Sequence, residues 1–257
     1  MKSKFFNTKT IAGLGILSAL VVVLQLLSNY VQFGPVSITL ALFPIAVGAM
    51  LYGPIGGLFL GLLDGALVLT APSTISFFFA ITPIGTIITC LGKTGLAGLV
   101  AGFIFKLYKK DIKVEFIAAL IILPIVLVCS TDQIFESTLL TYSYGRVLVS
   151  ALRFINMGVL AFLVIKGAIK PTKNSVILLT SLSVPVINTG LFLIASVTFF
   201  APKIIPMANS AGQNVFIFLI FAFIGWNFLL EFAVNAFLAS SFHNVYKSLE
   251  NNFARRK

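Results

Sequence analysis

Charged side chains are scarce in this sequence. Asp, Glu, Lys and Arg together make up only 10% of the 257 residues, whereas hydrophobic residues make up 59%. Soluble globular domains carry about 25% charged residues, so this composition excludes an ordinary soluble domain. The sequence instead indicates a chain that lies in a lipid bilayer.

The chain also has few of the residues from which metal sites and nucleophilic active sites are built. Its two cysteines, Cys90 and Cys129, lie in separate apolar runs, without the spacing of a metal site or a redox pair. Its one histidine, His243, follows the last apolar run and has no local partners for a Ser/His/Asp arrangement. We therefore expect no metal, no cofactor and no enzymatic activity.

Long apolar runs are what the sequence has in abundance. A helix needs about 20 apolar residues to cross a hydrocarbon core of about 30 Å. The runs predict eight spans, at residues 10–29, 38–52, 55–71, 81–105, 114–130, 147–165, 175–200 and 214–240. We therefore predict an all-α, polytopic transmembrane bundle that forms a single integral membrane domain over residues 1–257.

The positive charges indicate how the spans are threaded. Most of the 18 Lys and Arg lie before the first predicted span, after the fourth, after the sixth and after the eighth. Because cytoplasmic loops are enriched in these residues, both termini are predicted to be cytoplasmic. The basic residues come in small groups at span ends, so the net charge of +11 indicates contact with anionic lipids and not with nucleic acid.

Small residues recur at helical spacing in two of the predicted spans. Tyr52-Gly53-Pro54 predicts a tight hairpin, with Pro54 opening the next helix. Down that helix, Gly57, Gly61 and Gly65 recur every four residues and predict a groove for a neighbouring helix. The fourth span carries a similar row. Its members are Thr94, Gly98 and Gly102.

Two charges lie beside these small-residue rows. Asp64 shares the face of the glycine groove, and Lys93 precedes Thr94 in the fourth span. A charge at membrane depth is costly and marks a functional site by default. Two interpretations stand equally at this stage: the two charges neutralise each other inside the bundle, or they contact a ligand.

A polar stripe crosses the last predicted span. Asn227, Glu231 and Asn235 follow at i, i+4 and i+8, and must face protein, ligand or water. For any one residue the simpler role is an interhelical hydrogen bond, worth about 1 kcal/mol. For the whole set we expect ligand binding. The candidate ligand contacts are Asn29, Asp64, Lys93, Asn188, Asn227, Glu231 and Asn235.

Five segments resemble the substrate-binding S components of energy-coupling-factor (ECF) vitamin transporters, in the branch with pantothenate-type and uncharacterised members. They are SITLALFPI (37–45), MLYGPIGGLFLGLLD (50–64), KTGLAGLVAG (93–102), VPVINTGLF (184–192) and NFLLEFAVN (227–235). The resemblance implies a six-helix core in a bacterial plasma membrane, with a vitamin pocket on the extracellular side. It also implies two kinds of partner, a membrane coupling subunit and two cytoplasmic ATPases.

The chain departs from that family pattern in length. Residues 114–170 are predicted to form an extra helical hairpin inserted in the six-helix core. In the alternative register, the core ends near residue 168 and the last two spans are the addition. Both registers leave the identity of the vitamin open.

The first span has a flat face of small residues, Ala12, Gly15 and Ala19, of the kind that close helix association requires. The resemblance implies that this face docks on the coupling subunit.

The leading hypothesis is therefore a capture subunit of an ECF-type importer for a water-soluble vitamin or precursor. Pantothenate is the first expectation, and folate or riboflavin remain open. The alternative is a stand-alone secondary transporter in which Asp64 or Glu231 carries protons. A third interpretation is a membrane scaffold without a substrate.

Overall fold

The computed structural model describes residues 8–30, 32–33, 36–108 and 173–254. The predicted hairpin at 114–170 lies outside these residues. The helices in chain order are α1 (Thr8–Ser28), α2 (Leu42–Val68), α3 (Pro83–Tyr108), α7 (Lys173–Phe199), α8 (Ala201–Ser210), α9 (Val215–Leu219) and α10 (Gly225–Ala254). Two π-helical segments, η2 (Thr74–Phe79) and η3 (Ile220–Ile224), and a short antiparallel strand pair, β1 (Gln32–Phe33) with β2 (Val36–Ser37), complete the description.

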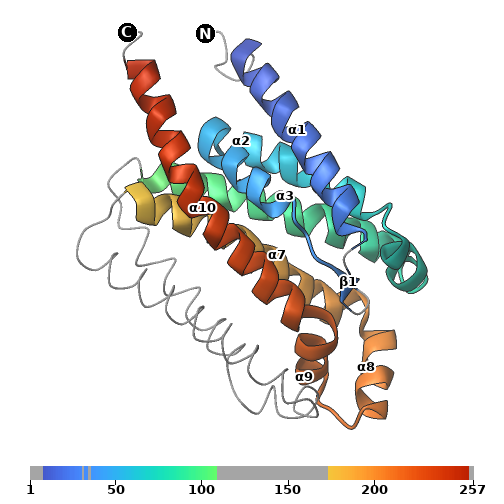
Figure 1. The fold of residues 1–257 in the computed structure, drawn as a ribbon. Coiled ribbons are helices and arrows are strands. Elements are labelled where there is room, and N and C mark those ends of the chain that lie inside the picture. The colour runs from blue at the N-terminus through green and yellow to red at the C-terminus, as the bar shows by residue number, and fades with distance from the viewer. Residues whose placement is uncertain (1–7, 31, 34–35, 109–172, 255–257) are drawn as a thin grey trace.

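The helices form a bundle with two distinct ends. The start of α1 and the end of α10 lie at one end, while β1, α8 and α9 lie at the other (Figure 1). Four of the described helices, α1, α2, α3 and α7, are by length and composition sufficient to cross a membrane, if the two arms of α2 described below are counted as one helix. A fifth span results if Ile217–Ile224 and Asn227–Phe242, which meet at 58°, count as one. A helical membrane bundle is thus confirmed, whereas the count of eight spans and the orientation of the termini stay predictions.

Helix α2 consists of two arms that meet at Gly53. This residue has φ 78° and ψ −170°, a conformation that suits glycine because it has no Cβ. An ideal Cβ on Gly56 would lie 3.2 Å from the carbonyl oxygen of Gly48, so the arms fold back on each other. In a continuous helix, residues eight apart are separated by about 12 Å along the axis. The hairpin predicted at residues 52–54 is therefore confirmed.

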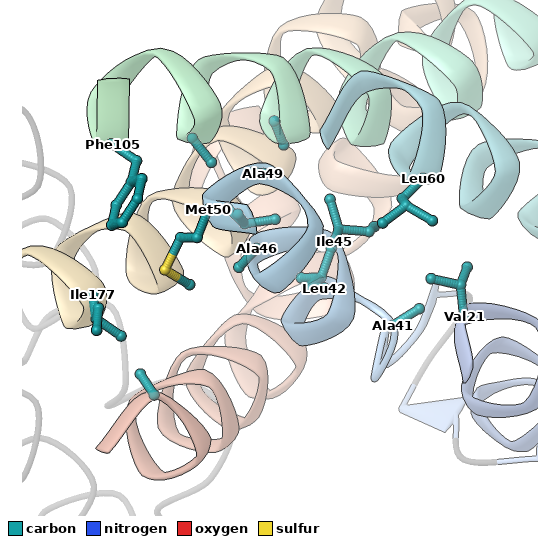
Figure 2. Packing of buried hydrophobic residues seen from close by; sticks show 14 of the residues in the cluster. Val21, Ala41, Leu42, Ile45, Ala46, Ala49, Met50, Leu60, Phe105 and Ile177 are labelled. Carbon is teal, nitrogen blue, oxygen red and sulfur yellow. The ribbon is translucent and has the colours of Figure 1, made fainter. Parts of the chain in front are cut away.

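The first arm of α2, residues 42–52, is a core helix. Leu42, Ile45, Ala46 and Ala49 have no exposed surface. Figure 2 shows this arm enclosed by neighbouring helices, with Met50 directed toward Phe105 and Ile177. The arm rises about 16 Å at 1.5 Å per residue, about half of a hydrocarbon core of about 30 Å. The span predicted at 38–52 is thus a short helix that is apolar all round because protein surrounds it.

The second arm of α2 packs against α3 through glycines. An ideal Cβ on any of the three glycines of the predicted groove would collide with a backbone carbonyl oxygen of α3. The pairs are Gly57 with Gly98, Gly61 with Thr94, and Gly65 with Cys90. Thr94 adds a hydrogen bond, because its Oγ1 donates to the carbonyl oxygen of Gly61 at 2.6 Å. Both predicted small-residue rows therefore meet at one interface.

This interface yields a first prediction. Gly61→Ala should lower the free energy of unfolding by about 1–3 kcal/mol, because its Cβ overlaps backbone that cannot move aside. Gly92→Ala is the matched control, since nothing lies within 4 Å of its Cβ position, and Ala should stabilise the helix there by up to about 1 kcal/mol. Thermal unfolding in detergent measures both, and equal midpoints for the two variants would contradict the packing.

Candidate functional site

Two hollows adjoin each other near the end of the bundle that carries the strands. Both are lined by Thr39, Lys93 and Phe192. The hydroxyl lobe spans about 410 Å³ of space between atoms, part of which is open to the outside, and its further lining includes Ser73, Thr74, Phe78, Thr86, Thr89 and Phe200. The amide lobe spans about 280 Å³, also partly open to the outside, and its further lining includes Asn188, Thr189, Phe223, Asn227, Phe228 and Glu231.

Helix α3 supplies one polar stripe to the hydroxyl lobe. Thr86, Thr89 and Lys93 are spaced at i, i+3 and i+7 and so share a face of the helix. The two threonine hydroxyls donate to carbonyl oxygens one turn back, Thr86 to Thr82 at 2.8 Å and Thr89 to Gly85 at 2.6 Å. Their oxygens remain available as acceptors. Sequence reasoning missed these threonines, although their spacing from Lys93 was a usable signal.

Irregular helices surround both lobes. Phe78 belongs to the π-helical segment η2, and Phe223 belongs to η3. Pro185 lies inside α7, one turn before Asn188. Because proline has no backbone N–H, one hydrogen bond of the helix is missing at Pro185. Helix α10 begins after the 58° bend and carries Asn227. Such π-helical segments are frequent at functional sites.

Glu231 joins α10 to the connection between α1 and α2. The backbone N–H of Thr39 donates to Glu231 Oε1 at 2.7 Å, and both residues are buried. The next backbone N–H, that of Leu40, donates to Ser28 Oγ on α1 at 3.0 Å. Residues 39 and 40 are thus fixed at the edge of the lobes by two side chains from different helices.

Lys93 lies between the lobes. Its side chain is 7% exposed, and its Nζ lies 5.4 Å from the centroid of the Phe192 ring, within the range of a cation–π interaction. The ammonium also interacts electrostatically with the carboxyl groups of Asp64 and Glu231. Both carboxyl oxygens of Asp64 are buried without a hydrogen-bond partner among the residues described. Asp64 and Lys93 therefore attract each other through space and not through a hydrogen bond.

The structure separates the predicted ligand contacts into two groups. The lobes are lined by Lys93, Asn188, Asn227 and Glu231. The other three predicted residues do not line either lobe. Asp64 is completely buried at the α2–α3 interface, Asn29 accepts from Gln25 Nε2 at 3.4 Å, and Asn235 donates from Nδ2 to the Glu231 carbonyl oxygen at 2.8 Å.

Asn235 also bonds to the neighbouring helix. Ser181 Oγ on α7 donates to its Oδ1 at 3.4 Å. This is the interhelical role that the sequence left open for single residues of the polar stripe.

Comparison with known families identifies the family of the chain. The model of the family "ECF transporter, substrate-specific component" matches residues 9–142, more than half of the chain. The chain belongs to this family. Comparisons with curated proteins and with solved structures give no significant match. The resemblance to ECF S components is therefore confirmed, while the pantothenate-type branch stays a prediction.

Membership establishes the general role of the chain. It is a substrate-specific component of an ECF transporter, a multi-pass membrane protein that binds a small molecule and is not a catalytic enzyme. The matched segment contains α1, α2, α3 and Lys93. The residues of α7, η3 and α10 that line the amide lobe lie beyond the matched segment of this ECF component.

The bond between Thr39 and Glu231 gives a second prediction. Glu231→Leu should speed hydrogen exchange of the Thr39 amide at least about tenfold, because a hydrogen bond to a charged group contributes about 1.5–3 kcal/mol. Glu231→Gln keeps an acceptor oxygen and should exchange close to the wild-type rate. Mass spectrometry of peptides covering residues 38–41 measures the effect. Equal protection in the Leu and Gln variants would show that Glu231 does not hold this segment.

Proposed function

We propose that this protein captures a water-soluble vitamin or vitamin precursor in the two lobes and delivers it to an energy-coupling module. The observation that carries the proposal is the convergence of Lys93, Asn188 and Glu231, from three helices, on one buried hollow region. Polar groups are costly at membrane depth, so their convergence on a hollow supports a ligand site. By resemblance, pantothenate is the first ligand to test, followed by folate and riboflavin.

The arrangement of the bundle supports capture from outside a bacterial cell. The start of α1 and the end of α10 share one end of the bundle, and η2 and the start of α3, which line the hydroxyl lobe, lie toward the opposite end (Figure 1). The distribution of Lys and Arg favours cytoplasmic termini. With that orientation the lobes face the extracellular side of the plasma membrane. Bent helices at the lobes agree with sites of transporters that alternate their access.

A third prediction tests ligand capture directly. One member of a panel of water-soluble vitamins should raise the unfolding temperature of the detergent-purified protein, since a ligand at about 100 times its Kd stabilises by about 2.7 kcal/mol. Asn188→Leu should weaken binding of that member at least about fivefold, because a lost buried hydrogen bond costs about 1 kcal/mol or more. Asn209→Leu, on the exposed face of α8, is the matched control.

Failure to bind any panel member in a folded sample would refute vitamin capture. Unchanged affinity in Asn188→Leu would refute the amide lobe as the site while leaving the capture role intact.

Helix α1 supports docking on a coupling subunit. Only 17% of its span is buried inside the protein, compared with 67% of the α7 span. Ala12, Gly15 and Ala19 are exposed, and nothing lies within 4 Å of the Cβ position of Gly15. Small residues on an exposed face allow another helix backbone to approach closely. We propose this face as the contact with the membrane coupling subunit, which two cytoplasmic ATPases energise.

A fourth prediction follows from this docking face. Ala19→Leu should abolish co-purification with the co-expressed coupling module and abolish uptake, while ligand binding stays unchanged, because a bulky side chain prevents close helix approach. Ala66→Leu is the control, since Ala66 is also exposed but lies on α2. Uptake that survives Ala19→Leu would refute the assigned face.

The uptake assay also distinguishes an ECF component from a stand-alone secondary transporter. The observation that supports the stand-alone transporter is the burial of the Asp64 and Glu231 carboxyl groups. Uptake in a host without the coupling module, abolished by a proton ionophore, would favour that alternative.

A further inference from the structure

The amide lobe is rich in hydrogen-bond acceptors. The Glu231 carboxyl group accepts from the Thr39 N–H at Oε1 and also bonds to the Thr39 side chain, although a carboxylate offers about four lone-pair sites. Asn188 is 4% exposed, and its Oδ1 is buried without a hydrogen-bond partner in the described part of the chain. A buried acceptor without a donor costs about 1–3 kcal/mol. A ligand that brings donors into this lobe would remove that cost.

The charges around Lys93 restrict which ligand group can enter. The Lys93 ammonium already interacts with the carboxyls of Asp64 and Glu231. A ligand carboxylate placed in the amide lobe would be attracted by Lys93 and repelled by Glu231, whereas an N–H group or a protonated amine would be attracted by Glu231. The carboxyl group therefore disfavours an anionic head group on its own side of Lys93.

Aromatic rings enclose the same lobe. Phe223 and Phe228 are each 2% exposed and line it, and Phe192 lines both lobes. Ring faces attract cations and stack on flat heterocycles. A carboxyl group, an unpartnered amide oxygen and aromatic walls together match a nitrogen-containing head group.

We infer that the amide lobe holds a nitrogen-bearing head group of the ligand, either a protonated amine or a ring or amide N–H, which donates to Glu231 and Asn188. The remainder of the ligand occupies the hydroxyl lobe, which shares Phe192 with the amide lobe. This inference rests on the proposed function, because it specifies the substrate class of the same site.

The test uses vitamin pairs that share a scaffold and differ in the head group. The pairs are thiamine with oxythiamine, riboflavin with 3-methylriboflavin, and pyridoxamine with 4-pyridoxate. In each pair the first member carries an N–H donor that the second member lacks. Isothermal titration of the detergent-purified full chain should show that, for any scaffold that binds, the first member binds at least about tenfold more tightly, or about 1.4 kcal/mol.

Two variants assign that preference to the amide lobe. Glu231→Gln replaces the carboxyl group with an amide that cannot ionise, and should reduce the affinity ratio of the pair at least about threefold, because a stronger acceptor is lost. Thr86→Val, in the hydroxyl lobe, is the control and should change the affinity for both members equally. The affinity ratio of each pair is measured on the wild-type protein, so the head-group preference can be tested even if Glu231→Gln folds poorly.

The outcomes distinguish failure of the head-group inference from failure of vitamin capture. Tighter binding of the methylated, oxo or carboxylate member, or an unchanged ratio in a folded Glu231→Gln protein, overturns the head-group inference and leaves vitamin capture standing. No binding by any scaffold to the folded protein overturns both.

Discussion

The direct contact between the backbones of α2 and α3 is the constraint on which the site depends. In a bilayer, lipid tails are as apolar as side chains, so helices associate through close packing and interhelical hydrogen bonds. Glycines at 57, 61 and 65 permit that packing, and the Thr94 hydroxyl bonds to the Gly61 carbonyl across it. Lys93 directly precedes Thr94 in the chain. The same contact that joins the helices therefore fixes the base of the Lys93 side chain between the two lobes.

The second constraint is the cost of polar groups at membrane depth. A charge at the centre of a bilayer costs about 2.5–3.5 kcal/mol on insertion scales, and Asp64, Lys93 and Glu231 all belong to apolar helices. All three are buried inside the protein, where each interacts with at least one of the others. The exposed face of α1 shows the converse, with Ile16 71% exposed. The three charges are thus held inside the bundle, whereas the exposed surface of α1 is apolar.

Helical spacing predicted which faces meet, because that information is local. The four-residue recurrence of glycine identified the α2–α3 interface, and Gly53-Pro54 identified the hairpin. Spacing did not predict at which position along the helix axis a polar side chain reaches a lobe. Asn227 and Asn235 share one stripe, yet they lie about 12 Å apart along the helix axis, so that one lines the amide lobe and the other bonds to Ser181.

Other features depend on contacts that no local pattern contains. Thr39 reaches the site because its N–H bonds to Glu231, 192 residues away in the chain. Hydropathy likewise does not distinguish the short core arm of α2 from a span, because both are apolar along their whole length.

The boundary of the family match falls between most of the residues that line the hydroxyl lobe and most of those that line the amide lobe. The matched residues 9–142 contain the exposed face of α1, the glycine interface, and the threonines of the hydroxyl lobe. The side chains that give the amide lobe its chemistry, Asn188, Asn227 and Glu231, come from beyond the match. The scaffold and the proposed docking face therefore both lie in the part of the chain that matches its family. We expect the chemistry of the ligand to be set mainly in the other part, with Lys93 as the charged group that both lobes share.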